Sequence, residues 1–300
     1  MTDRVSFQIL GPLQTSVQRH AIDIGGQRPQ LVLAALLLEP DRVIPTDRLV
    51  AAVWDDGPPV SARTQIAIAV SHLRRTFKQA GCAPGVIETV RPGYRLQTAV
   101  AGIDALSAER HVTAARTALR EGRGEEASAR FRTALGLWEG PVLAGLDRSV
   151  ITAGALRWEE LRLTVIEEAA QVDLALGRHH ELVGELMGPV SEHPFRERLR
   201  ALLMMALVRA GRQSEALAVY RDGRRIIADE LGLEPGRGLR ELHEAILRDD
   251  PSMYQRAAAP REAPAPPIGP TTCTGRVPRA RHRRRGGGGA RRPTRPRPRR

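Results

Sequence analysis

Lysine is almost absent from this chain, since Lys78 is the only one among 300 residues. A phosphate-binding loop of the Walker type needs a Gly-Lys-Ser/Thr sequence, which the chain therefore lacks. The two cysteines, Cys82 and Cys273, are too few for a disulfide scaffold or a four-ligand zinc site. The longest apolar run, Leu31 to Leu38, is too short to span a membrane. We therefore expect a soluble, cytoplasmic protein.

The sequence also lacks the residue patterns of an enzyme or a metal site. His179 and His180 are adjacent, so on a helix they point about 100° apart, and no HExxH sequence accompanies them. The pairs of carboxylates are sequence neighbours, whereas an acid/base pair needs two opposed groups. We expect a protein that is not an enzyme and that uses no cofactor and no metal.

The net charge of +12 arises at the C-terminal end of the chain. Residues 261–300 contain 13 arginines and one acid, while residues 1–260 contain 33 basic and 33 acidic side chains. The Pro-, Arg- and Gly-rich composition of residues 251–300 predicts a disordered tail. Two explanations stay open: a polycationic arm that adds non-specific DNA affinity, or a frameshift in a GC-rich coding sequence.

Residues 1–98 mix strand and helix signals. Strands are expected at Val5–Leu10 and Ala21–Ile24, because both segments are apolar and end at glycines. Helices are expected at Gln27–Glu39, from a capping Thr46 to Trp54, and at about Ser61–Gln79. Two short β segments, Val86–Val90 and Tyr94–Gln97, flank Arg91-Pro92-Gly93 and predict a hairpin.

The expected helix at residues 61–79 has one apolar stripe, formed by Ile66, Val70, Leu73 and Phe77. A helical wheel places the following residues on the opposite face: Thr64, Ile68, Ser71, His72, Arg75 and Gln79. This helix contains no acid, and residues 63–95 hold six basic side chains against one acid. Such a local excess of positive charge is typical of a surface that binds phosphates.

A helix of this kind fits the major groove of DNA, with the hairpin beside the backbone. His72 and Arg75 are the candidates for contacts with base edges. The candidates for phosphate contacts, which set register without reading sequence, are Arg63, Arg74, Lys78, Arg91 and Arg95. The helix alone leaves open a basic surface that binds no ligand.

Residues 103–250 are helical throughout and contain a repeat. Gly177-Arg178 and Gly211-Arg212 begin similar segments 34 residues apart, which is the period of a tetratricopeptide repeat. Gly122-Arg123 begins a third, separated from the second by an insertion around Trp138–Asp147. The expected fold is mainly α with small β elements: a winged helix-turn-helix domain at residues 1–98, an all-α tetratricopeptide-like domain at residues 103–250, and the tail.

Two motifs resemble the winged-helix domain of OmpR-type response regulators: Val70-Ser71-His72-Leu73-Arg74-Arg75 in the helix and Val90-Arg91-Pro92-Gly93-Tyr94-Arg95-Leu96 in the hairpin. With Phe7-Gln8-Ile9-Leu10-Gly11-Pro12-Leu13 and the helical half, the chain resembles the Streptomyces antibiotic regulatory protein family. In that family the winged helix precedes a tetratricopeptide-like bacterial transcriptional activation domain. His72 stands where many members have Arg, Lys or another polar residue, so the base read there stays open.

The resemblance implies a transcriptional activator of a secondary-metabolite (antibiotic) gene cluster, acting at the nucleoid. It would bind direct repeats in promoter DNA, as a homodimer or as one monomer on each repeat, and recruit the RNA polymerase holoenzyme. By its position in the OmpR-type fold, the loop Trp54–Val60 is expected to contact the polymerase. We expect an effector domain of the two-component type without a receiver domain. The alternative function is a helical-repeat scaffold for protein partners that carries a non-specific cationic tail.

Overall fold

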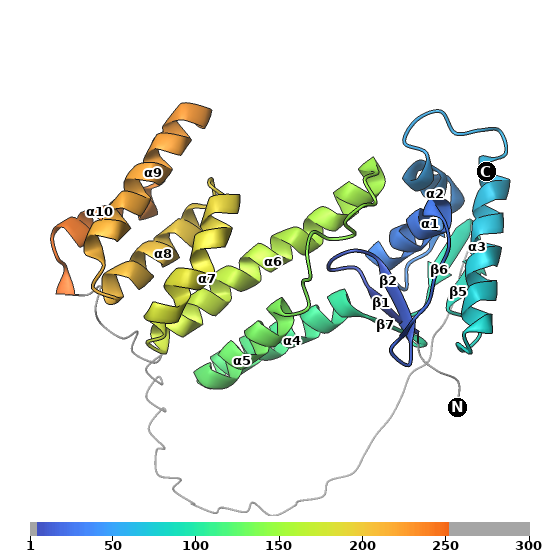
Figure 1. Cartoon of the computed structure of the whole chain (residues 1–300), viewed down its shortest axis with the longest axis horizontal. Coiled ribbons are helices and arrows are strands. Elements are labelled where there is room, and N and C mark those ends of the chain that lie inside the picture. The colour runs from blue at the N-terminus through green and yellow to red at the C-terminus, as the bar shows by residue number, and fades with distance from the viewer. Residues whose placement is uncertain (1–4, 252–300) are drawn as a thin grey trace, which may run out of the picture. The chain divides into compact units, whose positions relative to one another are not determined.

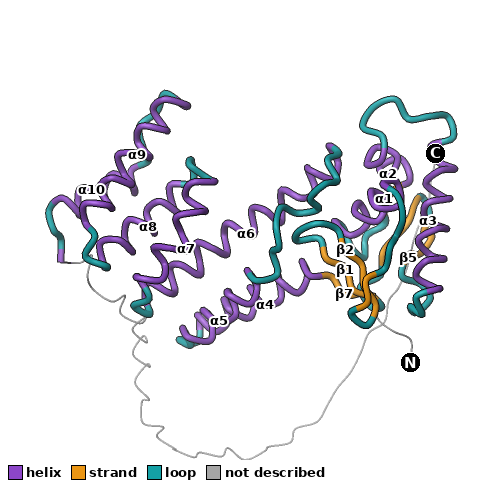
Figure 2. Tube along the Cα trace, viewed as in Figure 1, coloured by secondary structure: helices purple, strands orange, loops and turns teal. Residues whose placement is uncertain are grey.

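The computed structural model describes residues 5–251. The tail beyond residue 251, with Cys273, lies outside the described residues, and the predictions made for it are untested. Strands occur only within residues 5–103, and helices and loops make up the rest of the described chain (Figure 2). The chain is mainly helical with small sheets, as predicted. None of the helices within residues 5–251 has the length and apolar character that a membrane span requires.

The first sheet has the strand order β3-β2-β1-β7. Figure 1 labels β2, β1 and β7 next to one another. Its strands are β1 (Val5–Gln8), β2 (Gln14–Val17), β3 (His20–Ala21) and β7 (Ala101–Ile103). β1 pairs antiparallel with β2 and parallel with β7, which lies almost 100 residues later in the chain. Val5 and Phe7 are buried while Ser6 and Gln8 are exposed, so only one face of the sheet contributes to the core.

The strand predicted at Ala21–Ile24 is wrong beyond Ala21. Gly25 has a φ of 87°, and its backbone N–H donates to the Asp23 carboxylate at 2.8 Å. An aspartate that bonds to the backbone two residues later forms a turn, which ends the strand.

Three helices and a second sheet complete the N-terminal part. The helices are α1 (Gln27–Leu38), α2 (Thr46–Val53) and α3 (Ala62–Gln79), and the sheet has the order β4-β6-β5. The strands of this sheet are β4 (Ile44–Pro45), β5 (Ile87–Val90) and β6 (Gly93–Leu96). The predicted hairpin is confirmed, but its turn is Arg91-Pro92, because Gly93 already pairs with Val90 and Pro45.

The predicted cap of α2 is wrong. Pro45 occupies the capping position, and no side chain caps the helix there. The Thr46 hydroxyl instead donates to the carbonyl oxygen of Pro92 at 3.1 Å. Thr46 therefore connects the start of α2 to the turn of the hairpin.

Seven helices follow within the described residues: α4 (Asp104–Arg120), α5 (Gly124–Leu135), α6 (Ser149–Ala175), α7 (His179–Glu192), α8 (Glu197–Arg209), α9 (Gln213–Leu231) and α10 (Arg237–Leu247). The predicted glycine turns are confirmed at Gly122, Gly177 and Gly211, which have φ values of 74°, 84° and 75°. Glycine adopts this left-handed conformation without steric cost, so it ends one helix and lets the next run back.

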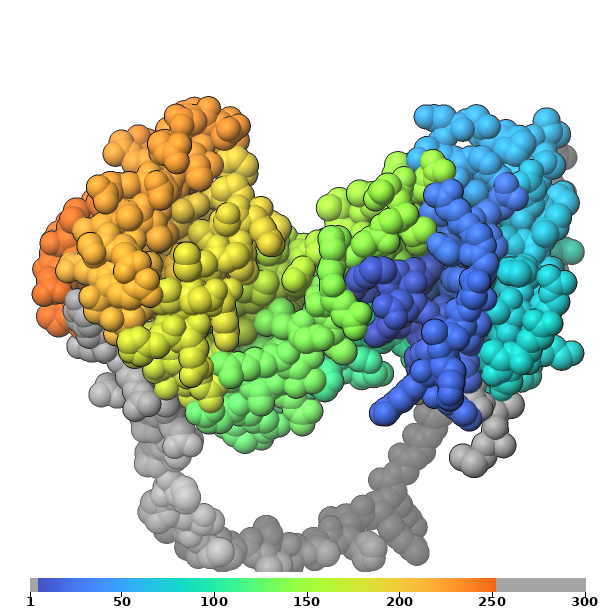
Figure 3. Space-filling view, in the orientation of Figure 1, coloured from blue at the N-terminus to red at the C-terminus, as the bar shows by residue number. Residues whose placement is uncertain are grey.

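The N-terminal and helical parts share a hydrophobic core. Trp138 and Trp158 are buried in the same cluster as Phe7 and Leu31. At the start of α6, a Cβ added to Gly154 would come within 2.6 Å of the Leu38 side chain of α1. The green atoms of the helical part accordingly lie directly against the blue atoms of the N-terminal part (Figure 3).

Candidate nucleic-acid interface

α3 presents a polar face to solvent. The predicted stripe is confirmed, because Ile66, Val70, Leu73 and Phe77 are all buried. The exposed predicted residues of this helix are Arg63, Thr64, Ile68, Ser71, Arg75, Lys78 and Gln79. Ile68 is 63% exposed, which is unusual for a large aliphatic side chain within a charged helix. One surface therefore combines cations, hydroxyls and one apolar side chain.

His72 differs from the other predicted face residues because it is half-buried. Its Nε2 lies 3.2 Å from the carbonyl oxygen of Ile24, which can only accept a hydrogen bond. Nε2 therefore carries the proton, and Nδ1 is left to accept from the Arg75 guanidinium at 3.3 Å. In this arrangement His72 orients Arg75.

A groove of about 540 Å³ runs along this face, between α3 and the start of α1. Ile68 and His72 contribute to one wall of the groove, and Gly26 and Arg28 to the other. Arg28 is exposed and its guanidinium lies 5.3 Å from the centre of the Trp54 ring. The sequence reasoning missed Arg28, although a basic residue two positions after Gly26, in the first turn of a helix, was a signal for it.

Arg74 is placed differently from its neighbour Arg75. Its Nε donates to the carbonyl oxygen of Ile87 and its Nη2 to the Thr89 hydroxyl, each at 2.9 Å. Its guanidinium also lies 5.9 Å from the centre of the Tyr94 ring. Arg74 therefore joins α3 to the hairpin through contacts within the protein.

The remaining predicted cations divide into paired and unpaired groups. Arg95 donates to Glu88 at 2.7 Å, and this hydrogen bond lowers the pKa of the Glu88 carboxyl. Arg63 pairs with Asp47 at 2.6 Å, and both side chains are more than 70% exposed. Within residues 5–251, by contrast, no acid forms an ion pair with Arg75, Lys78 or Arg91. These three side chains are available to an anion.

Of the three unpaired cations, Arg75 also lines the groove, Lys78 lies one turn further along α3, and Arg91 lies in the turn of the hairpin. Among residues 5–251, no cluster of three or more His, Cys, Asp or Glu side chains is placed to hold a metal ion. Cys82 is buried next to the core. His179 and His180 are the first two residues of α7.

Two family models match the chain. Residues 26–96 match "Transcriptional regulatory protein, C terminal" and residues 103–247 match "Bacterial transcriptional activator domain". The first match contains α3 and the hairpin, and the second covers α4 to α10.

The relatives compared below are named as regulators. The chain is 35% identical to regulatory protein DnrI of Streptomyces peucetius over 83% of its own length and 94% of DnrI. It is 38% identical to regulatory protein AfsR of Streptomyces coelicolor over 85% of its length, but spans only 25% of AfsR. A second AfsR, from Streptomyces griseus, is likewise covered over only 26%.

One solved structure shows the same architecture. Mycobacterium tuberculosis EmbR, described as a complex with a low-affinity phosphopeptide, matches with a TM-score of 0.78 and 35% sequence identity. The match covers 84% of this chain and 68% of the EmbR chain. A winged helix followed by a helical domain is therefore the arrangement of a known regulator.

Proposed function

The chain belongs to the Streptomyces antibiotic regulatory protein family of transcriptional regulators, which are not enzymes, and on this premise we propose that it activates promoters by binding their DNA through α3 and the hairpin. The observation that carries the proposal is the set of unpaired cations on the exposed face of α3, next to a groove. Double-stranded DNA supplies a phosphate charge about every 1.7 Å, which matches such a surface.

Residues at the centre of α3 recognise the base sequence. Arg75, held by His72, reaches toward a guanine edge, where a guanidinium forms two hydrogen bonds. Ile68 is placed for the methyl group of a thymine, and Thr64 and Ser71 for polar base edges. Each good base contact contributes about 1–3 kcal/mol of discrimination.

Phosphate contacts set the register of the helix in the groove. Lys78 and Arg91 are unpaired and contact the backbone directly, and Arg63 and Arg95 do so by exchanging a carboxylate for a phosphate. Arg74 contributes to DNA binding by holding the hairpin in place. The sites are direct repeats, occupied by a homodimer or by one monomer on each repeat.

Activation requires a second contact, with the RNA polymerase holoenzyme. We assign it to the loop between α2 and α3, where Val60 is fully exposed. Asp55 in this loop accepts hydrogen bonds from the backbone N–H and hydroxyl of Ser149, at 2.9 and 2.7 Å. The loop is thereby joined to the start of α6. The proposed targets are promoters of a secondary-metabolite gene cluster on the nucleoid, a proposal that rests on the family resemblance.

The test is selection of bound sequences from a random pool of double-stranded DNA with the full chain. We expect a spaced direct repeat to be enriched, and Arg75→Ala to weaken binding to it by about tenfold or more. Arg221→Ala is the control, because Arg221 is an exposed arginine of α9 without an ion pair within residues 5–251. Enrichment of no sequence, or equal affinity of the Arg75 variant, would favour a scaffold with a cationic tail.

A further inference from the structure

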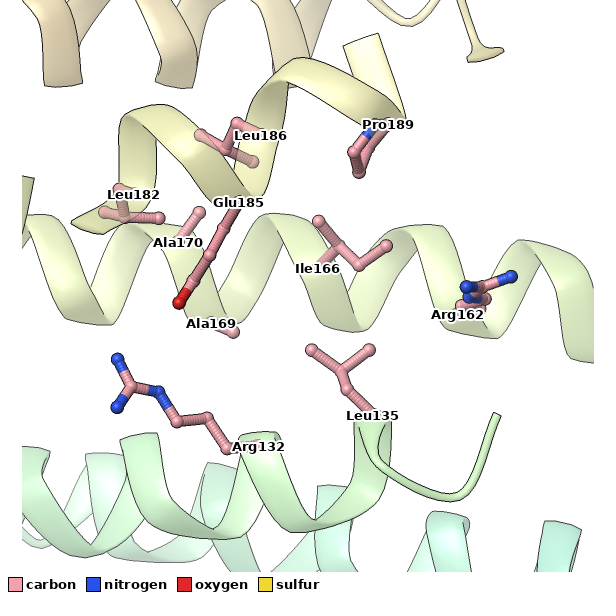
Figure 4. A pocket seen from close by; sticks show the side chains of 10 residues that line it. All are labelled: Arg132, Leu135, Arg162, Ile166, Ala169, Ala170, Leu182, Glu185, Leu186 and Pro189. Atoms are coloured by element: carbon pink, nitrogen blue, oxygen red, sulfur yellow. The ribbon is translucent and has the colours of Figure 1, made fainter. Parts of the chain in front are cut away.

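A second groove, of about 370 Å³, lies between α5, α6 and α7 and shares no residue with the face of α3 (Figure 4). Its floor is apolar and is formed by Leu135, Ile166, Ala169, Leu186 and Pro189. An open apolar groove between stacked helix pairs is a surface on which a peptide lies in other helical-repeat proteins. The charged side chains along it indicate which peptide fits.

One end of the groove is balanced in charge. Arg132 lies 3.2 Å from the Asp173 carboxylate and 3.7 Å from the Glu181 carboxylate. Glu185 also reaches toward Arg132 across the groove (Figure 4). An additional carboxylate from a bound peptide would therefore gain little electrostatic attraction at this end of the groove.

The other end carries an unbalanced cation, Arg162. It lies seven residues before Ala169, or two turns of α6, and Figure 4 shows it well apart from Arg132. Arg162 is half-buried, and within residues 5–251 it forms neither an ion pair nor a hydrogen bond. A guanidinium that is partly removed from water beside apolar side chains favours a carboxylate partner, because a charged pair recovers the lost hydration.

α7 supplies a further polar group on the edge of this groove. Pro189 lies inside the helix and has no backbone N–H, so it cannot donate to the carbonyl oxygen of Glu185, four residues earlier. Both residues line the groove. The carbonyl oxygen of Glu185 therefore receives no hydrogen bond from residue 189 within α7.

We propose that this groove binds a peptide segment of a partner protein, whose apolar side chains cover the floor and whose aspartate or glutamate pairs with Arg162. The arginine-rich residues 261–300 have the wrong sign of charge for Arg162, as their 13 arginines and one acid show. A nucleic acid gains one phosphate contact but leaves the apolar floor uncovered and faces Glu185. An acidic, apolar peptide satisfies every part of the groove.

The test is selection of peptides from a random display library by the immobilised full chain. It is run at about 0.3 M salt, where exposed charges are screened beyond several ångströms. We expect enrichment of peptides that combine an acid with Leu, Ile or Phe. Arg162→Glu is expected to weaken binding of a selected peptide by about tenfold or more, and selection on this variant to yield Lys or Arg at the acidic position. Arg221→Glu, a reversal at an exposed and unpaired arginine of α9, is the control and leaves the affinity unchanged.

Three outcomes overturn the proposal: selected peptides without an acid, equal binding by the Arg162 variant, or equal weakening by the Arg221 control. Circular dichroism and thermal unfolding show whether Arg162→Glu folds, and Arg162→Gln takes its place if it does not. The DNA gel shift is run on the same variants, and both retain DNA affinity. A failure in peptide binding therefore leaves the DNA-binding proposal intact, and the reverse also holds.

Discussion

The backbone N–H of Ile9 donates to the carboxylate of Asp104 at 2.9 Å, which joins the end of β1 to the first residue of α4. The N–H of Leu10 donates to the same carboxylate at 2.9 Å. The carbonyl oxygens of Ile9 and Leu10 accept from Leu143 and Glu139, at 3.0 and 2.7 Å. The chain after β1 is therefore bound on both sides by residues of the helical part.

Replacing Asp104 by Ala is expected to lower the free energy of unfolding by about 1–3 kcal/mol, since two partly buried N–H groups lose their acceptor. Urea unfolding followed by circular dichroism measures the change. Asp147→Ala is the control, because Asp147 is exposed and forms no ion pair within residues 5–251. An equal effect of the two substitutions would show that the carboxylate of Asp104 contributes nothing specific.

Gly93→Ala is expected to destabilise the protein by about 1–3 kcal/mol or more, because it forces the hairpin away from β4. A Cβ at this position would lie 1.8 Å from the carbonyl oxygen of Ile44, which is backbone and cannot rotate away. Gly102→Ala is the matched control, since Gly102 also lies in a strand and its nearest neighbour would be 3.5 Å away. Thermal unfolding compares the two, and equal melting temperatures would contradict the expectation.

Arg74→Ala, Lys78→Ala and Arg75→Ala are each expected to weaken DNA binding, for three different reasons. Loss of Arg74 removes two hydrogen bonds to the hairpin, so it lowers the melting temperature and leaves the salt dependence unchanged. Lys78→Ala instead removes a phosphate contact, so it reduces the slope of log affinity against log salt by about one and leaves the melting temperature unchanged. Arg75→Ala relaxes specificity at one base pair.

Gel shifts at several salt concentrations, together with thermal unfolding, separate these cases. A reduced salt slope for Arg74→Ala would show that Arg74 contacts phosphate after all.

Acid is expected to destabilise the end of the helical part through His243. This ring stacks on Tyr220 with centroids 3.8 Å apart and planes 10° apart. Burial lowers the pKa of His243, and Arg224 lowers it further, while Glu244 acts in the opposite direction. The unfolded chain therefore takes up the proton more readily. The stability that neutral His243 contributes is fully present above the ordinary histidine pKa of about 6.5. It is lost as the pH falls through the lower pKa that His243 has in the folded chain.

The measurement is the melting temperature between about pH 7.5 and 5.5. His243→Phe preserves the stacking without a titrating group, so its melting temperature is expected to fall less than that of the unmodified chain. Burial also lowers the pKa of His179, and that contribution is common to both proteins. If the melting temperatures of the two proteins fell equally with pH, His243 would have no role in the acid destabilisation.

The sequence predicted those features that depend on local periodicity. α3 was predicted because its four apolar residues share one face. The turns at Gly122, Gly177 and Gly211 were predicted because glycine adopts a left-handed backbone conformation without steric cost. β7 was missed because three residues become a strand only through pairing with β1, far away in the chain. Local propensity carries no information about such a partner.

The sequence predicted the exposed basic surface of α3, but not the hydrogen-bond partners of its individual residues. Arg74 and Arg75 are adjacent and chemically identical, yet one is bonded to the hairpin and the other is bonded to His72. Their difference arises from a rotation of 100° and from what the hairpin places beside the helix. Arg162 was not recognised from the sequence, because its lack of a partner depends on where every acid of the helical part lies.

The core that Trp138 and Trp158 share with the winged helix has a consequence for promoter architecture. In the proposed DNA complex, no free linker separates the two parts, so the angular position of the helical part around the DNA axis follows that of α3 in its groove. Moving the binding site by about 5 base pairs would rotate the helical part to the opposite side of the duplex, and a shift of about 10.5 would return it. Activation would then vary with helical phase, while affinity for DNA would not.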